Sequence, residues 1–345
     1  MKPLLAAINR QSTPHTPVWM MRQAGRYLPE YRELRAKTGG FMRMCQTPEI
    51  ACEITLQPIR RFPLDAAIIF SDILTIPDAM GLELTFVEGE GPSFAKRIGN
   101  ENDIAALPRI DPINQLGYVA RALELTAKEL PSQVTLIGFS GSPWTIATYM
   151  IEGGSPKGSF VLSRRMLYSQ PELLRALLDK LTEAVTNYLI MQIDAGAEVV
   201  QIFDTWGGIL PAQSYLDFSL APMSTIIRRV QQHSPHTPIT LFTKGGGQWL
   251  TAMAASGCDC IGVDWTTNLT QARNQVGHKC ALQGNLDPAI LRSPPEVIRA
   301  HTNAMLQSYG NHPGHIANLG HGITPDIPPE HAEAFIHAVH DFTSE

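Results

Sequence analysis

Eight short apolar segments, separated by helical patterns, limit what this chain can fold into. They cover residues 18–21, 66–70, 134–139, 198–203, 239–243, 260–264, 280–284 and 315–319. Most are apolar at nearly every position, which is typical of parallel strands covered on both faces. Helical patterns lie over residues 48–61, 113–130, 171–196, 214–233, 248–256, 270–276, 294–309 and 329–342. This alternation predicts an α/β fold, a single (β/α)8 barrel that occupies residues 1–345 as one domain.

Two further features refine this prediction. Residues 82–98, with glycines at 89 and 91, are expected to form a small β-hairpin inserted near the barrel mouth. An open, doubly wound sheet is the alternative architecture. That fold calls for a glycine-rich phosphate loop after its first strand, and the sequence has none there.

Composition places the chain among soluble enzymes. It is 44% hydrophobic and 17% charged, which is ordinary for a globular protein. The longest uncharged run, residues 130–151, is interrupted by proline and glycine, so no membrane span is expected. The apolar run at the N-terminus is too short for a signal peptide. Five cysteines without framework spacing favour reduced thiols and a cytoplasmic location.

A basic segment near the N-terminus stands out against an acidic background. Between Met20 and Arg43 there are six Lys or Arg residues and two Glu residues, a local charge of +4 in a chain whose total is −5. The rest of the chain therefore carries −9. Such an island indicates a bound anion of small size rather than general affinity for nucleic acid or membranes. Pro29 begins a predicted helix that the pair Gly39-Gly40 ends, which leaves Arg22 and Arg26 on the preceding loop.

In a barrel of this kind, chemistry belongs on the loops that follow the strands. Polar candidates stand at most of these positions: Arg22, Arg26, Ser71, Asp72, Ser140, Tyr149, Asp204, Thr205, Lys244, Asp264, Asn285, Asp287 and His321. Each also has an ordinary structural explanation. Asp72 and Thr205 can cap helices, Tyr149 can be a core ring, and His321 can be structural.

Metal and phosphate signals are weak. The glycine triplet 245–247 needs only to permit a tight turn. His278 and Cys280 are the one pair that could begin a zinc site, but no cysteine follows Cys280.

The segment Trp19-Met-Met-Arg-Gln-Ala-Gly-Arg-Tyr-Leu-Pro-Glu-Tyr-Arg32 closely resembles the N-terminal motif of the uroporphyrinogen decarboxylase family. The resemblance continues through Ile69-Phe-Ser-Asp-Ile-Leu74, Gly141-Ser-Pro-Trp-Thr145, Tyr149-Met-Ile-Glu-Gly153, Phe203-Asp-Thr205 and Asn318-Leu-Gly-His-Gly322. It spans essentially the whole chain. It implies a single-domain (β/α)8 barrel, usually a homodimer. The implied reaction converts the four acetate side chains of uroporphyrinogen III to methyls, giving coproporphyrinogen III without cofactor or metal.

The resemblance also implies roles for individual residues. Arg22, Arg26 and Arg35 are expected to face substrate carboxylates, and the backbone of residues 23–25 lines the same wall. The implied substrate-binding set is Arg22, Gln23, Ala24, Gly25, Arg26, Arg35, Asp72, Tyr149, Thr205 and His321. The implied catalytic set is Asp72 as transition-state stabiliser with Arg22, Tyr149 and His321.

These residue types suit such a substrate. Arginine binds carboxylates through a planar, permanently charged fork. An ionised aspartate offers about four lone-pair sites and no donor, so Asp72 can accept from the four pyrrole N–H groups of a domed ring. Its charge would also stabilise a ring protonated on carbon, which is the electron sink that other decarboxylases take from a cofactor. The proton donor stays open among Arg22 with a bound water, Tyr149 and His321.

Two other functions remain as alternatives. A zinc-dependent methyltransferase of corrinoid or thiol type shares the barrel and would use His278 and Cys280. A non-catalytic tetrapyrrole carrier would bind the same ligand and release it unchanged. Stoichiometric zinc would favour the first, and the absence of CO2 release would favour the second.

Overall fold

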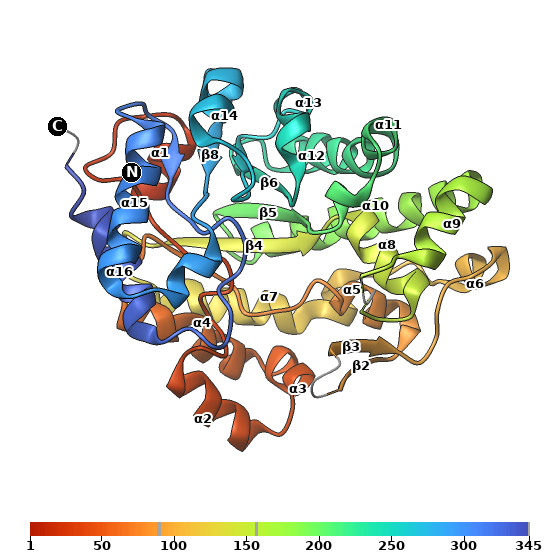
Figure 1. Cartoon of the computed structure of the whole chain (residues 1–345). Coiled ribbons are helices and arrows are strands. Elements are labelled where there is room, and N and C mark those ends of the chain that lie inside the picture. Colours follow the sequence, from red (N-terminus) through yellow and green to blue (C-terminus); the bar gives the residue numbers. More distant parts are fainter. Residues whose placement is uncertain (88–90, 156–157, 344–345) are drawn as a thin grey trace.

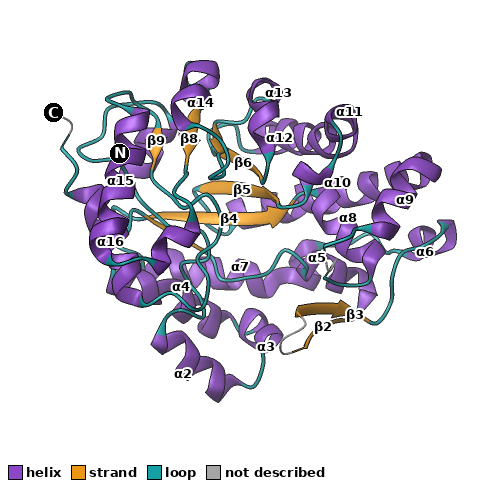
Figure 2. Ribbon diagram, viewed as in Figure 1, coloured by secondary structure: helices purple, strands orange, loops and turns teal. Residues whose placement is uncertain are grey.

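Seven parallel strands form one curled sheet at the centre of the molecule (Figure 2). The computed structural model describes residues 1–87, 91–155 and 158–343. The strands pair in the order β1-β4-β5-β6-β7-β8-β9, every neighbour parallel. Their bounds are β1 Ala66–Ile68, β4 Thr135–Gly141, β5 Val199–Asp204, β6 Ile239–Thr243, β7 Cys260–Gly262, β8 Ala281–Gln283 and β9 His315–Ile316. Each lies within or within two residues of a predicted strand, and the fold is of the TIM-barrel-like α/β type.

The predicted first strand, residues 18–21, is not a strand in the structure. Only Val18 is paired there, in a single parallel bridge with Ala317 after β9. Its carbonyl also accepts the N–H of Asp65 at 2.9 Å, just before β1. Two residues later the chain turns, and the Gln23 N–H donates to Met20 O at 2.9 Å. Pro17, which has no N–H, and this turn limit the pairing to one residue.

Helices surround the sheet and connect its strands in sequence (Figure 1). They are α1 Pro3–Ile8, α2 Pro29–Thr38, α3 Phe41–Gln46, α4 Pro48–Arg61, α5 Thr75–Pro77, α6 Glu101–Ala106, α7 Pro112–Glu129, α8 Pro143–Glu152, α9 Val161–Ser169, α10 Pro171–Asp194, α11 Ala212–Tyr215, α12 Ala221–His233, α13 Leu250–Ala255, α14 Leu269–Val276, α15 Pro295–Tyr309 and α16 Pro329–His340. Shorter 3-10 or π segments are η1 Asp78–Leu82, η2 Gly207–Ile209, η3 Leu216–Leu220, η4 Gly246–Trp249 and η5 Pro288–Arg292.

Proline at the first position and glycine after the last position explain several helix ends that the sequence predicts. α2 begins at Pro29 and is closed by Gly39 in the left-handed conformation, at φ 82°. α4 and α10 begin at Pro48 and Pro171. The predicted helix over 214–233 is divided into α11, η3 and α12. Helix α8 was not predicted, because nearly all of its residues are buried and give no amphipathic period.

A separate two-stranded antiparallel sheet pairs β2 Leu84–Val87 with β3 Gly91–Phe94. It falls in the segment expected to form a hairpin. The predicted turn, with glycine at 89, lies outside the described residues. A bridge between Ser93 and Gly154 joins this sheet to the end of α8.

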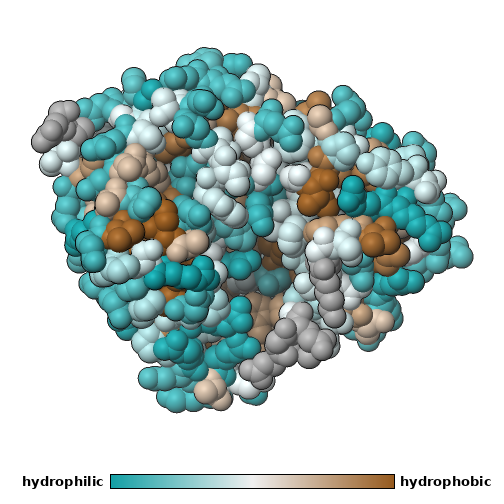
Figure 3. All heavy atoms as spheres, viewed as in Figure 1, coloured by the Kyte–Doolittle hydropathy of each residue, from teal (hydrophilic) through white to brown (hydrophobic). Residues whose placement is uncertain are grey.

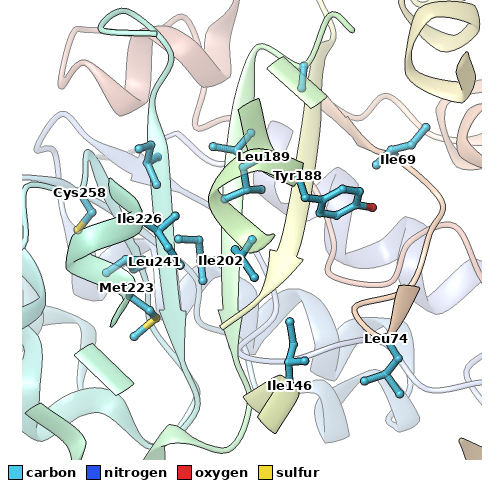
Figure 4. Packing of buried hydrophobic residues seen from close by; sticks show 14 of the residues in the cluster. Ile69, Leu74, Ile146, Tyr188, Leu189, Ile202, Met223, Ile226, Leu241 and Cys258 are labelled. Carbon is cyan, nitrogen blue, oxygen red and sulfur yellow. The ribbon is translucent and has the colours of Figure 1, made fainter. Parts of the chain in front are cut away.

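The main hydrophobic core lies between the sheet and its outer helices. Figure 4 shows Ile202 of β5 and Leu241 of β6 near Met223 and Ile226 of α12. Every residue of β5 and β6 is buried, as expected for strands covered on both faces. The large buried surface fixes the strand ends, and hence the loops that follow them, in space.

Two smaller expectations can be compared with the structure. All five cysteines, Cys45, Cys52, Cys258, Cys260 and Cys280, are buried and free. Among the described residues, no helix has both the length and the apolar character needed to cross a membrane.

Candidate active site

The candidate site lies where the parallel strands end. β4 runs toward α8, and α5 and the β2–β3 pair lie on that same side of the molecule, whereas α15 and α16 lie on the side where β4 begins (Figure 1). Most candidate residues follow directly after strands and therefore share this end of the sheet. The space-filling view shows a hollow near the middle of the viewed face, with hydrophilic and hydrophobic residues around it (Figure 3).

Asp72 stands four residues after the end of β1, half-buried on the loop that leads into α5. Its Oδ1 accepts the Leu74 N–H at 2.8 Å, and its carbonyl accepts the Thr75 hydroxyl at 3.0 Å. Burial raises the pKa of the carboxyl to about 6, and the Leu74 N–H and the charge of Arg22 only partly oppose this. The carboxyl is thus mostly ionised at neutral pH, and it forms no ion pair within the described part of the chain.

Arg22 adopts the left-handed backbone conformation, with φ 67°. Its side chain passes over Gly322, where a Cβ atom would lie 2.3 Å from Arg22 Cδ. Glycine at 322 is therefore required for this path, and the first and last sequence motifs meet here. The Arg22 charge also shifts the pKa values of Asp72, Tyr149 and His321. The structure thus brings these four predicted residues together.

The side chain of Gln23 has a structural role, because its amide oxygen and nitrogen both form hydrogen bonds within the protein. It is completely buried; its Oε1 accepts from Met20 N and its Nε2 donates to Ala66 O, both at 2.9 Å. These bonds fix the basic loop to β1. Ala24 and Gly25 follow on the same turn, half-buried. Because the Gln23 side chain is buried, only the backbone of this loop is available to a ligand at that residue.

Arg26 is exposed and Arg35 of α2 is half-buried. Both guanidinium groups oppose the rise that burial causes in the pKa of Tyr31, so both lie close to that ring. Tyr31 packs edge-on against Phe70, with ring centroids 5.8 Å apart, and Phe70 lies two residues before Asp72. This aromatic contact attaches α2 and its arginines to the end of β1.

Tyr149 lies on α8, half-buried, with its ring centroid 6.3 Å from that of Trp206. Burial raises the pKa of its hydroxyl; Trp206 and Arg22 lower it, and Asp72 raises it further. The indole N–H of Trp206 is buried and lies beside the Tyr149 hydroxyl, whose pKa it lowers. A polar donor is thus available beside Tyr149.

Asp204, at the end of β5, is completely buried and holds neighbouring loops together. Its carboxylate accepts four hydroxyl groups, from Ser142 at 2.6 Å, Thr145 at 3.0 Å, Ser219 at 2.7 Å and Thr243 at 3.2 Å. Burial still raises its pKa. The predicted Thr205 follows directly and is half-buried. The sequence marked Asp204 as a strand-end residue but did not distinguish this positioning role.

His321 is half-buried on the loop after β9. Its ring centroid lies 6.1 Å from that of Phe242 and 6.3 Å from that of Trp265. Burial, together with the charges of Arg22 and Lys244, lowers the pKa of the imidazole to about 3. The imidazole is therefore largely uncharged at neutral pH in this environment.

Lys244 is a further cation at this end of the sheet. Its Nζ lies 5.9 Å from the ring centroid of Trp206 and 5.6 Å from that of Trp265, within cation–π range. Like Arg22, Arg26 and Arg35, it forms no ion pair within the described ranges. The sequence showed Lys244 at a strand end, but its neighbours are non-local and could not be predicted.

The possible zinc pair is not supported by its surroundings. Within residues 1–87, 91–155 and 158–343, His278 and Cys280 belong to no group of three potential metal ligands. His278 instead lines a surface pocket of about 410 Å3 together with Arg10 and Arg273. This pocket contains none of the predicted site residues.

Comparisons with known proteins agree with the resemblance seen in the motifs. The family model described as Uroporphyrinogen decarboxylase (URO-D) matches residues 1–342. A protein of Tolumonas auensis named uroporphyrinogen decarboxylase is 60% identical over 342 residues, which cover 99% of this chain and 96% of that protein. One of Citrobacter koseri with the same name is 55% identical over 343 residues, covering 99% and 97%.

Among solved structures, a methyltransferase from Methanosarcina mazei superposes with a TM-score of 0.82 at 21% sequence identity, covering 99% of this chain and 98% of that one. At this identity the likeness concerns the fold alone.

Proposed function

The chain belongs to the uroporphyrinogen decarboxylase (URO-D) family, and we propose that its strand-end site decarboxylates uroporphyrinogen in haem biosynthesis. The enzyme is a carboxy-lyase. In the finer form of the proposal, the four acetate arms of uroporphyrinogen III become methyls and coproporphyrinogen III is the product. The observation that carries this assignment is the half-buried Asp72 carboxylate beside Arg22, two opposite charges that form no ion pair within the described residues.

The cations account for binding of a polyanion. Arg22, Arg26 and Arg35 are proposed to hold substrate carboxylates, since a guanidinium forms bidentate, charge-assisted bonds. Three arginines cannot neutralise eight carboxylates. We therefore add Lys244, which stands between Trp206 and Trp265, and the buried indole N–H of Trp206. Thr205 and the backbone of Gln23, Ala24 and Gly25 complete the proposed binding set.

Asp72 is negatively charged, unlike the arginines, because it is proposed to contact the pyrrole ring of the substrate and not the carboxylate arms. One lone pair of Oδ1 accepts the Leu74 N–H, and the remaining carboxylate lone pairs, about three, can accept pyrrole N–H groups of a domed tetrapyrrole. Burial keeps the charge poorly solvated, so a cation that develops on the ring gains more from it than it would in water. The arginines thus orient the substrate while Asp72 stabilises the reacting system.

The reaction proceeds by protonation, bond cleavage and reprotonation. A proton added to a pyrrole carbon converts the ring into a cationic imine-type electron sink. The bond between the acetate methylene and its carboxylate then breaks, CO2 leaves, and the electron pair enters the ring. A proton on the resulting methylene carbon gives the methyl group, and the ring releases the first proton. Each arm consumes one proton overall.

The pKa shifts of the candidate residues support the following assignment of the proton donor. Neutral His321 is a weak acid in this environment, and we assign it to hydrogen bonding with the substrate. Arg22 with a bound water and Tyr149, both beside Asp72, are the proposed donors. Neither assignment requires a metal or cofactor.

The finer architectural expectations belong to the same proposal. The bridge at Val18, between β9 and the start of β1, supports closure of the sheet as a complete (β/α)8 barrel over residues 1–345. We further propose a β-hairpin over 82–98 near the mouth, a homodimer and a cytoplasmic location. Light scattering of the purified chain tests the homodimer.

Anaerobic incubation with uroporphyrinogen III tests the activity directly. Mass spectrometry is expected to show stepwise loss of four CO2 and accumulation of coproporphyrinogen. Saturable binding without any mass loss would contradict the enzyme assignment and favour a tetrapyrrole carrier. Isomer I, run in parallel, measures the preference for the arrangement of the arms.

A further inference from the structure

A cluster of His15, Asp65 and His340 lies at the opposite end of the sheet from the candidate active site. Asp65 immediately precedes β1, whereas Asp72 follows it, a separation of roughly 20 Å at the rise of an extended chain. The three side chains come from an N-terminal loop, the start of β1 and the last residue of α16. The decarboxylation proposal does not use any of them.

The geometry of the cluster is that of a ligand set. One ligand atom from each residue lies within 4.8 Å of the other two. His15 Nε2 is 3.0 Å from Asp65 Oδ1, and His340 Nε2 is 3.8 Å from Asp65 Oδ2. The ligand atoms of a tetrahedral zinc site lie roughly 3.3 Å apart, given bonds of about 2.0–2.1 Å. Small side-chain rotations therefore suffice to bring the three atoms onto one ion.

A second observation points to a missing partner. His340 Nε2 is buried and has no hydrogen-bond partner within the described part of the chain. Buried ring nitrogens without partners are uncommon in folded proteins. Asp65 is itself buried, and its Oδ2 is fixed by the Val18 N–H at 2.8 Å. One ligand is thus held by the backbone, and another carries a nitrogen that is free to coordinate.

We propose that His15, Asp65 and His340 bind one divalent transition-metal ion, preferably Zn²⁺, as a structural site that joins both ends of the chain to β1. Two imidazoles and one carboxylate suit Zn²⁺, Co²⁺ or Ni²⁺ more than Ca²⁺ or Mg²⁺. The side chains of His15 and His340 are partly exposed, so solvent can supply the fourth ligand. Because the site is remote from Asp72, the ion acts on stability and not on decarboxylation.

Zinc titration of the full, chelator-treated chain at pH 7.5 tests this proposal. Calorimetry is expected to show one Zn²⁺ per chain, and saturating zinc is expected to raise the Tm by a few degrees through linkage. Co²⁺ bound to the same ligands is expected to give a visible absorption band. Decarboxylation of uroporphyrinogen is expected to proceed at the same rate with and without chelator.

Ligand variants distinguish this site from adventitious binding. His15→Ala and His340→Ala are each expected to weaken zinc binding by at least about 100-fold, while their metal-free Tm values confirm that they fold. His337→Ala, one turn earlier on α16, is the matched control and is expected to bind like the wild type. No saturable zinc binding, or unchanged binding by both ligand variants, would overturn the proposal.

Discussion

Asp65 and Asp72 lie at opposite ends of the same short strand, and their carboxyl groups behave in opposite ways. For Asp65, burial would raise the pKa, but His15, His340 and the Val18 N–H outweigh it, so the pKa falls below its usual range. For Asp72, burial prevails over the Leu74 N–H and the Arg22 charge, and the pKa rises to about 6. The protein therefore stabilises the ionised carboxylate of Asp65 at one end of the strand and stabilises that of Asp72 poorly at the other.

The difference in pKa separates two roles for carboxylates at the two ends of β1. At the start of β1 the carboxylate closes contacts between segments that are distant in sequence, which stabilises the barrel. At the end of β1 the Asp72 carboxylate accepts the Leu74 N–H, but among the described residues neither it nor the nearby Arg22 forms an ion pair. Charges that the protein leaves unpaired in a half-buried site are available to a ligand. The comparison therefore supports a stabilising role for Asp65 and the proposed catalytic role of Asp72.

The largest expected effect is on turnover. Asp72→Asn keeps the shape of the side chain and removes its charge, so kcat for uroporphyrinogen should fall by about 10²–10³. The matched variant at the other end of β1, Asp65→Asn, should keep kcat within a few-fold. Steady-state assays with mass detection measure both. Equal losses in the two variants would break the comparison.

The next effect concerns stability. Asp72→Asn and Asp65→Asn should change the free energy of unfolding in opposite directions. Asp72 has a raised pKa, so its ionisation opposes folding above about pH 6 and has no effect below about pH 4. At pH 7.5 Asp72→Asn should therefore raise the free energy of unfolding by about 1–3 kcal/mol. Asp65→Asn loses charge-assisted hydrogen bonds and should lower it by about 1–3 kcal/mol.

Urea unfolding at pH 7.5 measures these changes. Repeating it near pH 4 supplies a control, because the gain in Asp72→Asn should shrink as the wild-type carboxyl becomes protonated. A destabilised Asp72→Asn at pH 7.5 would mean that the Asp72 charge is satisfied within the chain.

The smallest effect is expected at Lys244. Lys244→Gln removes one cation from the proposed carboxylate-binding set and should raise KM by about tenfold, with a smaller change in kcat, as loss of one charge-assisted bond implies. Lys279→Gln, an exposed lysine away from the site, should leave both constants unchanged. A KM equal to that of the wild type would remove Lys244 from the binding set.

Much of this arrangement could be predicted from the sequence because it depends on local pattern. The apolar segments located seven strands, and Pro29 and Gly39 marked the ends of α2. Asp72 could be placed at a strand end because residues 66–70 are apolar throughout. Residues 18–21 have the same apolar character yet form only a bridge at Val18, since pairing depends on the neighbouring segments.

The remainder depends on contacts between distant residues. The requirement for glycine at 322 follows from the path of the Arg22 side chain, which no local pattern reveals. The same holds for His321, whose pKa is lowered by burial and by Arg22 and Lys244. The pKa of an unperturbed imidazole lies near neutrality, and only the folded environment shows that the pKa of His321 is lower.

The pH dependence of kcat/KM tests the central claim most directly, because it reports the ionisation of essential groups in the free enzyme. If ionised Asp72 drives the reaction, kcat/KM should rise with pH to a plateau, with a midpoint at about 6. Below that midpoint it should fall about tenfold per pH unit. A profile that stays flat down to pH 5 would contradict the account.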